Sequence, residues 1–438
     1  MKELSVFLRL AAFVLLAFPA LAQRPCATDA LFRNKKGAEY FPGGRIFESK
    51  LKEISAEQSK SVTADNDSIY YIPVVVHVLH YGEAIGTGRN ISQERIQSQI
   101  DILNQDYGKL PNSPGYNTFP AGADTRIRFC LATVDPNGNP SNGIVRVQTT
   151  QDAFDLFSQN TILKGYSNWD PEKYLNIWVC RLLGNFIGYA QYPMISPQWA
   201  DSLPMVPNVE DVQPDGVVIE YRVFGNVPNG QGAPYGVYNK GRTASHEVGH
   251  YLGLLHIWGD GGSCADNKTD FCADTPPQAT YTSGCPAVAV ESCTPGVPAL
   301  VENYMDYSND TCMNVFTQEQ KKRMRIVLRN CVRRKSVAST TQGCEISTGN
   351  PPKPPVKVKK LFLEFVSGKD YLNVKSEDIK LTEINLYNYL GRKIESIQIN
   401  SNYATYPYEL NLAGLSRGTY FIKAKDTEGV YRIASFCH

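Results

Sequence analysis

The chain lacks an excess of charge of either sign. Its 438 residues carry 44 lysines and arginines against 43 aspartates and glutamates, and its pI is about 7.5. This balance gives no reason to expect nucleic acid or an anionic membrane as a partner. A chain of this length should hold two or three domains, and its first large block is long enough to bury a full core.

Long hydrophobic runs are also missing. The one candidate, residues 10–18, is too short to span a bilayer as a stable helix. It follows the basic residues Lys2 and Arg9 and precedes the small residues of positions 20–22, which is typical of a secretory signal. We therefore expect residues 1–22 to be a signal peptide, the mature chain to be secreted, and no transmembrane segment to follow.

Histidine is scarce, with six in the whole chain, but three of them fall within one short stretch. His246 and His250 are four residues apart and share a helix face, so both can bind one metal ion. Glu247 is rotated by about 100° from His246, which places its carboxylate beside the metal, where it can take a proton from water. Gly253 can adopt a left-handed conformation, end the helix and deliver His256 as a third ligand. Three imidazoles with one open position indicate a catalytic zinc site.

These residues resemble the signature of the metzincin metallopeptidases, in which a third histidine and a methionine turn follow the first two histidines. The shorter two-histidine motif often arises by chance, whereas the glycine and third histidine at fixed offsets rarely do. The candidate turn is residues 303–307. The resemblance implies that Met305 forms a hydrophobic floor under the three histidines, although a lone methionine would be read as a core residue. It also implies that Tyr307 stabilises the developing oxyanion.

The flanking residues narrow the resemblance to the pappalysin family in its compact bacterial form, over roughly residues 70–332. The segments that carry it are 169–178, 215–219, 241–245, 256–260 and 301–307. The resemblance implies a secreted zinc endopeptidase that hydrolyses proteins or peptides, with Zn²⁺ as its cofactor.

The eleven cysteines are read as those of an exported protein, in which disulfides form. The odd count leaves at least one over, and Cys26 lies alone near the expected mature N-terminus. The resemblance implies that Cys26 binds the zinc of a latent precursor, although relatives usually have glycine where this chain has Ala27; an ordinary disulfide cysteine is the alternative. The resemblance also implies the disulfides Cys264–Cys293 and Cys285–Cys312. The cysteines without an assigned partner are Cys130, Cys180, Cys272, Cys331, Cys344 and Cys437.

Two further sites follow from the resemblance. Residues 266–278 are rich in oxygen donors, and the corresponding loop of compact pappalysins carries Ca²⁺, which suggests Asp270 and Thr275, together with Asp266, as ligands. Composition alone fits a plain polar loop nearly as well. Asp310 matches an aspartate that lines the pocket after the scissile bond and favours Arg or Lys there. The alternative is an aspartate in a surface loop.

The domain organisation follows from composition shifts along the chain. Residues 23–67 are polar and are expected to form a pro-segment. Residues 68–344 are expected to form an α+β domain of the metzincin type, with a cleft between an upper sheet and a lower, loop-rich half. Its predicted elements are strands at 70–79, 127–131, 175–179 and 217–221 and a helix at 92–103. The basic run 321–335 is predicted to be a solvated helix with one buried face, begun by a capping box at Thr317 and Gln320.

Residues 345–358 form a proline-rich linker, and residues 359–438 alternate apolar and polar side chains as in a small β-sandwich. The sandwich resembles the C-terminal sorting domain of type IX secretion, which implies that secretion machinery as a partner. A generic carbohydrate- or surface-binding β-domain is the competing interpretation.

A second class of function remains open, namely a surface adhesin that keeps the metzincin fold without turnover. Loss of turnover usually removes the general base first, and Glu247 is present. A weaker third alternative is that activity serves only the maturation of the precursor.

Overall fold

The computed structural model of the chain describes residues 26–32, 41–60, 68–194, 214–227, 235–339, 344, 361–365, 370–376, 381–388, 392–399, 408–426 and 431–437. The expected signal peptide and linker lie outside these residues. The chain divides into two compact units, Met1–Glu345 and Ile346–His438. Among the helices that the structure describes, none is long and apolar enough to cross a membrane.

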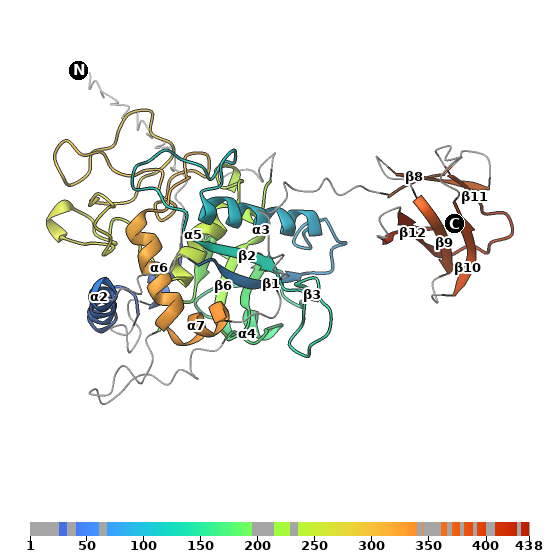
Figure 1. Cartoon of the computed structure of the whole chain (residues 1–438), viewed down its shortest axis with the longest axis horizontal. Helices are drawn as coiled ribbons and strands as arrows, with labels where there is room; N and C mark the ends of the chain where they lie inside the picture. Colours follow the sequence, from blue (N-terminus) through green and yellow to red (C-terminus); the bar gives the residue numbers. More distant parts are fainter. Residues whose placement is uncertain are drawn as a thin grey trace, which may run out of the picture. The chain divides into compact units, whose positions relative to one another are not determined.

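The first unit is built on a six-stranded sheet (Figure 1). The strands are β1 Tyr70–His80, β2 Ile127–Leu131, β3 Ile144–Gln148, β4 Leu175–Cys180, β5 Gly188–Ala190 and β6 Gly216–Glu220. Their order is β2-β1-β4-β6-β5, and β3 also pairs with β1. The pairs of β1 with β2, β3 and β4 are parallel, as is the pair β4–β6, whereas β5 is antiparallel to β6 and ends the order.

Helices pack against this sheet, and β1 is therefore buried on both faces. The helices are α1 Thr28–Phe32, α2 Arg45–Lys60, α3 Gln93–Gly108, α4 Asn160–Gly165, α5 Arg242–Tyr251, α6 Gln318–Asn330 and α7 Val332–Ser339. Alternate side chains of a strand point to opposite faces. Val74, Val76 and Val78 therefore share one core with apolar residues of α3 and α5, while Leu79 packs with α4 in another. This arrangement supports α5 on the face of the sheet beside β5 and β6.

The helix predicted at 92–103 is confirmed as α3. The side chain of Ser92 accepts a hydrogen bond from the backbone N–H of Arg95, which caps the helix. The strand predicted at 127–131 is β2, and the other three predicted strands correspond to β1, β4 and β6 within a few residues. The capping box of Thr317 and Gln320 is confirmed at the start of α6.

The basic run 321–335 differs from the predicted single solvated helix. Its helix ends at Cys331, whose backbone is extended at φ −77° and ψ 137°, and α7 follows. The prediction of a solvated charged face was wrong, because Arg323 and Arg334 are buried. Each guanidinium can be buried because it meets a carboxylate, that of Glu48 for Arg323 and that of Asp215 for Arg334.

The predicted loop-rich half lies between α5 and α6. Residues 252–317 are all described and contain no α-helix or strand, only a short 3₁₀ helix at Cys264–Asp266. Two disulfides, Cys264–Cys293 and Cys285–Cys312, cross-link these loops. A third disulfide joins Cys130 in β2 to Cys344, 214 residues away. Such bridges restrict the unfolded chain and so stabilise a segment with little regular structure.

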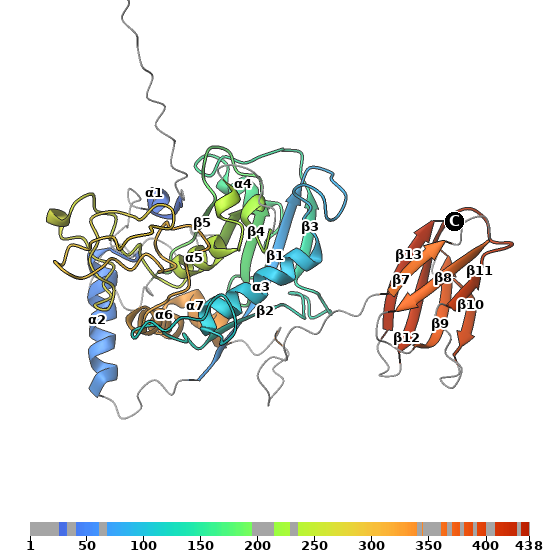
Figure 2. The same cartoon turned by 90° about the horizontal axis from the view of Figure 1, so that it is seen from above.

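The described N-terminal residues, 26–32 and 41–60, pack against the rest of the first unit. Helix α1 contacts β5, and α2 lies beside α6 (Figures 1 and 2). Phe47 and Leu51 of α2 share an apolar cluster with α6. The Glu48 carboxylate binds the Arg323 guanidinium through two hydrogen bonds of 2.6 and 2.7 Å. A bidentate pair of this kind, shielded from water, fixes α2 in one position.

The second unit consists of two antiparallel sheets. The strands are β7 Leu361–Phe365, β8 Tyr371–Ser376, β9 Leu381–Asn388, β10 Lys393–Gln398, β11 Tyr408–Asn411, β12 Thr419–Asp426 and β13 Tyr431–Cys437. One sheet has the order β10-β9-β12-β13 and the other β11-β8-β7. Leu372 and Val374 of β8 share a buried cluster with Ile384 of β9 and Ile422 of β12. The two sheets therefore enclose one core, as expected for a β-sandwich.

Candidate active site

Helix α5 and the turn after it bring three histidines together. His246 and His250 lie one turn apart on α5 and are fully buried. Gly253 has φ +90°, and its N–H donates to the His250 carbonyl as the helix ends. A Cβ at this glycine would lie 2.8 Å from the Val327 side chain, so both the backbone and the space favour glycine. The reversed chain then returns His256 to the first two histidines.

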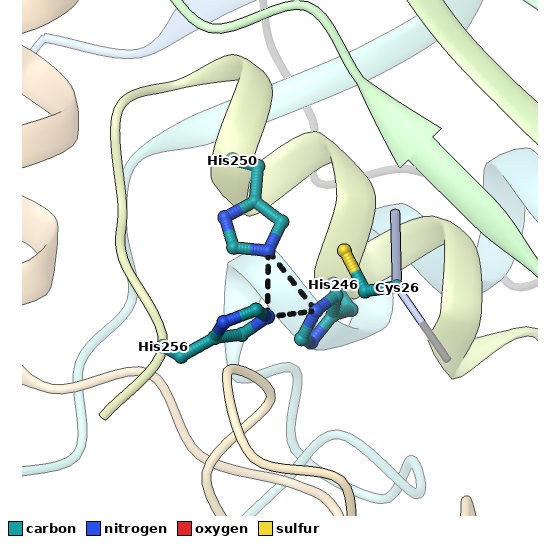
Figure 3. Close-up of side chains that lie close together, drawn as sticks. All are labelled: Cys26, His246, His250 and His256. Atoms are coloured by element: carbon teal, nitrogen blue, oxygen red, sulfur yellow. Dashed lines mark hydrogen bonds between the residues drawn. The ribbon is translucent and has the colours of Figure 1, made fainter. Parts of the chain in front are cut away.

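The three imidazoles converge through their Nε2 atoms. The Nε2 atom of His250 lies 3.1 Å from the Nε2 of His246 and 3.1 Å from that of His256, and the third separation is 3.3 Å. Figure 3 shows the three rings gathered around one point, with the Cys26 side chain beside them. A zinc ion with Zn–N bonds of about 2.05 Å in a tetrahedral arrangement would separate its nitrogen ligands by about 3.3 Å.

The hydrogen bond of the Nδ1 atom of each ring determines its tautomer. Each Nδ1 lies 2.8–2.9 Å from an oxygen acceptor: the Tyr304 carbonyl for His246, the Leu254 carbonyl for His250 and the Asp260 carboxylate for His256. Each Nδ1 must therefore carry the proton, which leaves three Nε2 lone pairs facing one another. Burial, and then the charge of His256, lower the pKa of His250 to about 3. Imidazoles with converging lone pairs fit a bound cation, and zinc is one of the transition-metal ions that imidazole ligands bind.

Glu247 is held beside the histidines by the edge of the sheet. Its side chain is buried, and a Cβ on Gly188 of β5 would lie 2.9 Å from its Cγ. Any larger residue at position 188 would push the carboxylate away. Gly188 is therefore the residue that makes room for Glu247, a role that the sequence motif does not reveal.

The methionine turn lies under α5 as the resemblance implies. Met305 is fully buried, and a Cβ on Gly249 would lie 2.5 Å from its Sδ atom. The ring of Tyr307 meets the His256 ring edge to face, with centroids 5.0 Å apart. Burial raises the pKa of the Tyr307 phenol well above its usual value, so its hydroxyl stays protonated. Asp306 fixes this turn, because its carboxylate accepts the backbone N–H groups of Tyr307 and Thr282.

The N-terminal segment enters the site at Cys26. The ligand atoms of Cys26, His246, His250 and His256 all lie within 4.8 Å of one another. The Cys26 thiol donates to Glu247 Oε2 at 3.5 Å. Burial, and then the charge of Glu247, raise the pKa of this thiol well above its usual value. A divalent cation at the histidines would reverse that preference and favour the thiolate.

Two neighbours of Cys26 also reach the site, and sequence reasoning missed both. The Thr28 hydroxyl donates to Glu247 Oε2 at 3.0 Å. The Asp29 carboxylate lies 2.9 Å from His256 Nδ1, the atom that Asp260 also contacts, and accepts from the Tyr192 hydroxyl at 2.8 Å. Their position two and three residues after Cys26 was the available signal.

Asp310 lies at the start of α5. It is buried, which excludes the surface-loop interpretation. Its Oδ2 accepts the backbone N–H groups of Lys240 and Arg242 at 2.9 and 3.1 Å. Because the preceding Gly241 offers no side chain, Asp310 supplies the anionic cap of the active-site helix from a distant segment.

The residues of the predicted calcium loop lie in different environments. Asp270 is buried, and its carboxylate accepts from the Thr275 hydroxyl at 2.9 Å and from the Cys272 amide at 3.1 Å. Burial raises the pKa of Asp270 to about 7. Asp266 is exposed and accepts the backbone N–H groups of Gly262 and Ser263.

Comparisons with known proteins agree with this geometry. Residues 232–329 match the family model described as pregnancy-associated plasma protein-A, and residues 368–433 match that of a secretion system C-terminal sorting domain. An extracellular metalloprotease of Arthroderma otae is 32% identical over 281 residues, which cover 64% of this chain and 86% of the relative. An extracellular metalloprotease 1 of Coccidioides posadasii is 30% identical, over 70% of this chain and 93% of the relative.

Two solved structures are also similar to this chain. Tannerella forsythia mature mirolysin in complex with a cleaved peptide is 39% identical, with a TM-score of 0.51, over 62% of this chain and 96% of that one. A promirolysin variant from the same organism is 34% identical, with a TM-score of 0.55, over 72% of this chain and 96% of that one. The sorting domain and the extracellular relatives indicate a secreted protein. The chain thus belongs to the pappalysin family of zinc metallopeptidases, with a secretion sorting domain at its C-terminal end.

Proposed function

We propose that the chain is the latent precursor of a secreted endopeptidase that cleaves proteins or peptides. The observation that carries this proposal is the convergence of three neutral imidazoles with a buried glutamate beside them. The mirolysin structure with a cleaved peptide supports peptides as the substrate class. Digestion of a proteome-derived peptide library by the mature form tests the proposal, with a variant that lacks Glu247 as its control.

In the proposed mechanism, His246, His250 and His256 would hold Zn²⁺, which when bound would supply Lewis-acid chemistry to the scissile carbonyl and to water. Glu247 takes the proton of the attacking water on its carboxylate and passes it to the leaving amine. Tyr307 donates its protonated hydroxyl to the developing oxyanion. Asp260 orients His256 through its Nδ1–H, which keeps the ring in the tautomer that binds the metal.

We further propose that residues 23–67 form a pro-segment that blocks all three catalytic components at once. Cys26 would supply a thiolate to a zinc ion held by the three histidines and so exclude water from it. The Thr28 hydroxyl donates a hydrogen bond to the Glu247 carboxylate, which is then not free to accept a proton from water. Besides burial, the Cys26 thiol and backbone influence the pKa of the Tyr307 phenol, so Cys26 lies beside this hydroxyl. Neither a water molecule nor a substrate carbonyl then has access to the reactive groups.

Asp310 is proposed to favour Arg or Lys immediately after the scissile bond. The support is a buried carboxylate at the start of the active-site helix, in the position that matches the pocket aspartate of the family. A guanidinium or ammonium facing it would gain a charge-assisted hydrogen bond of about 1.5–3 kcal/mol.

Asp310→Asn is expected to flatten this preference. The amide oxygen of asparagine can still accept the N–H groups of Lys240 and Arg242, so the helix cap survives while the charge is lost. Selectivity for basic over neutral side chains should fall by roughly ten- to a hundred-fold. Cleavage-site profiling of wild type and variant on one peptide mixture measures this. The role is excluded if the wild type shows no basic preference or the variant keeps it in full.

A calcium ion is proposed at the loop 266–278, with Asp270 and Thr275 as ligands and Asp266 nearby. Burial disfavours the charge of the Asp270 carboxylate, which accepts from a hydroxyl and an amide, and a hard cation would stabilise that charge. Removing calcium with a selective chelator should therefore lower the Tm of the wild type but not that of Asp270→Asn. Equal Tm values with and without calcium in the wild type would contradict this site.

The second unit is proposed to direct the protein to a type IX secretion machinery. Its β-sandwich core and the match of residues 368–433 to a sorting-domain model support this proposal.

A further inference from the structure

The aromatic ring of Phe32 fills an apolar pocket beside the active site. Its centroid lies 5.4 Å from that of Tyr192, and Met194 and Leu255 belong to the same buried cluster. Phe32 is only 4% exposed. Phe41 packs against it, with ring centroids 5.2 Å apart. Three residues outside the N-terminal segment form the walls of this pocket, and we call them the Phe32 pocket: Tyr192, Met194 and Leu255.

The Phe32 pocket adjoins the metal ligands. Leu255 directly precedes His256, and the Tyr192 hydroxyl lies 3.4 Å from His250 Nδ1. The Tyr192 ring also meets the His250 ring edge to face, with centroids 5.5 Å apart. A cavity of about 500 Å³, lined in part by Phe32, Tyr192 and Leu255, opens next to it.

The N-terminal segment shows how far the pocket lies from the reacting centre. Cys26 forms a parallel bridge with Gly188, the first residue of β5. The Thr28 hydroxyl accepts the N–H of Ala190, two residues further on. Phe32 then meets Tyr192, four residues beyond Gly188. Strand β5 ends at Ala190, and four extended residues span about 13 Å. A substrate that continues past β5 in extended form would therefore reach the pocket about four residues from the one at the metal.

We propose that the Phe32 pocket is a substrate subsite for one large apolar side chain, three to five residues from the cleaved bond. In the precursor Phe32 occupies the subsite, and in the mature form a Phe, Tyr, Leu or Met of the substrate takes its place. Met194 and Leu255 are its specificity-determining residues. This inference rests on the proposed function, because it requires that the N-terminal segment leaves and that a peptide binds along β5.

The chemistry of the walls favours an apolar occupant. Tyr192 offers its ring to the pocket, while its hydroxyl points to Asp29 and His250. Met194 and Leu255 offer no charge, so a charged side chain would lose its hydration without gaining a partner. Burial of a phenyl side chain should raise kcat/KM by roughly 10- to 100-fold over glycine at that position.

The test compares peptides that carry Phe or Gly at the selected position, cleaved by enzyme that has matured from the full chain. Profiling of the wild type on a peptide library should first show an apolar preference at one position within three to five residues of the cut. Met194→Ala should then reduce the Phe-over-Gly ratio of kcat/KM by about three- to tenfold. Met194→Leu, which keeps an apolar wall of similar volume, should keep the Phe-over-Gly ratio of the wild type.

Val288→Ala is the matched control, because Val288 is 79% exposed in the disulfide-bonded loops. It should leave the Phe-over-Gly ratio unchanged, and zinc content should be equal in all variants. The subsite is contradicted if a cleaving wild type shows no apolar preference at these positions, or if Met194→Ala keeps the full ratio. A wild type that cleaves no peptide at all would overturn the proposed function itself.

Discussion

Replacing Glu247 with alanine is expected to remove most proteolysis while zinc stays bound and the fold survives. A general base typically contributes about 10²–10⁴-fold to the rate, and kcat/KM should fall by that factor. The three imidazoles and their Nδ1 partners are untouched by the change, so the metal site stays complete. Alanine also fits beside Gly188, where the glutamate side chain now lies closely packed.

The measurement is the cleavage of a fluorogenic peptide or casein by the mature variant, together with its zinc content. Glu291→Ala, a change of an exposed glutamate in the same unit, is the control and should keep full activity. A zinc-loaded Glu247→Ala enzyme with near-normal turnover would rule out the proposed mechanism. Activity loss accompanied by zinc loss would show instead that the glutamate supports the metal site.

Replacing Cys26 with alanine is expected to make the precursor active or self-cleaving. Without the thiol, water can enter the open position at the histidines, and Thr28 alone then covers Glu247. A single charge-assisted contact of about 1.5–3 kcal/mol already represents a roughly 10- to 100-fold population difference. The activity of the precursor should rise by at least that factor, or the precursor should convert to the mature form during expression.

The rate of conversion of the purified precursor is the quantity to measure, by gel mobility and peptide cleavage. Cys180→Ala is the matched control, because Cys180 is also a buried free thiol but lies in β4. Adding Thr28→Val to Cys26→Ala should speed conversion further, since Glu247 then loses its last hydroxyl partner from the segment. A Cys26→Ala precursor as latent as the wild type would mean that steric cover by α1 and α2 causes latency.

The metal site was predictable from the sequence because it depends on local rules. Helical periodicity places His246 and His250 together, and the left-handed Gly253 returns His256. The groups that orient these ligands were not predicted: Leu254 and Asp260 each lie four residues from the histidine they contact, whereas Tyr304 lies 58 residues from His246. Asp260 lies in a turn that no periodicity describes.

Contacts across long sequence separations account for most of what the sequence could not show. The partner of Cys130 lies 214 residues away, and no spacing rule identifies it. The burial of Arg323 depends on Glu48 in another helix, so the basic run alone suggested a solvated face. Asp310 is similar, because its role as a helix cap becomes visible only when the fold brings it to α5.

Removal and restoration of the metal in the mature form tests the central claim most directly. Zinc is stripped with a chelator, its content is measured by mass spectrometry, and peptide cleavage is followed as zinc is added back. We expect activity to fall in proportion to the zinc lost and to return fully at one zinc ion per chain, with no return in Glu247→Ala. Full activity in enzyme that retains less than about a tenth of an equivalent of zinc, or of any other divalent metal, would contradict an active site in which a histidine-bound metal activates the water.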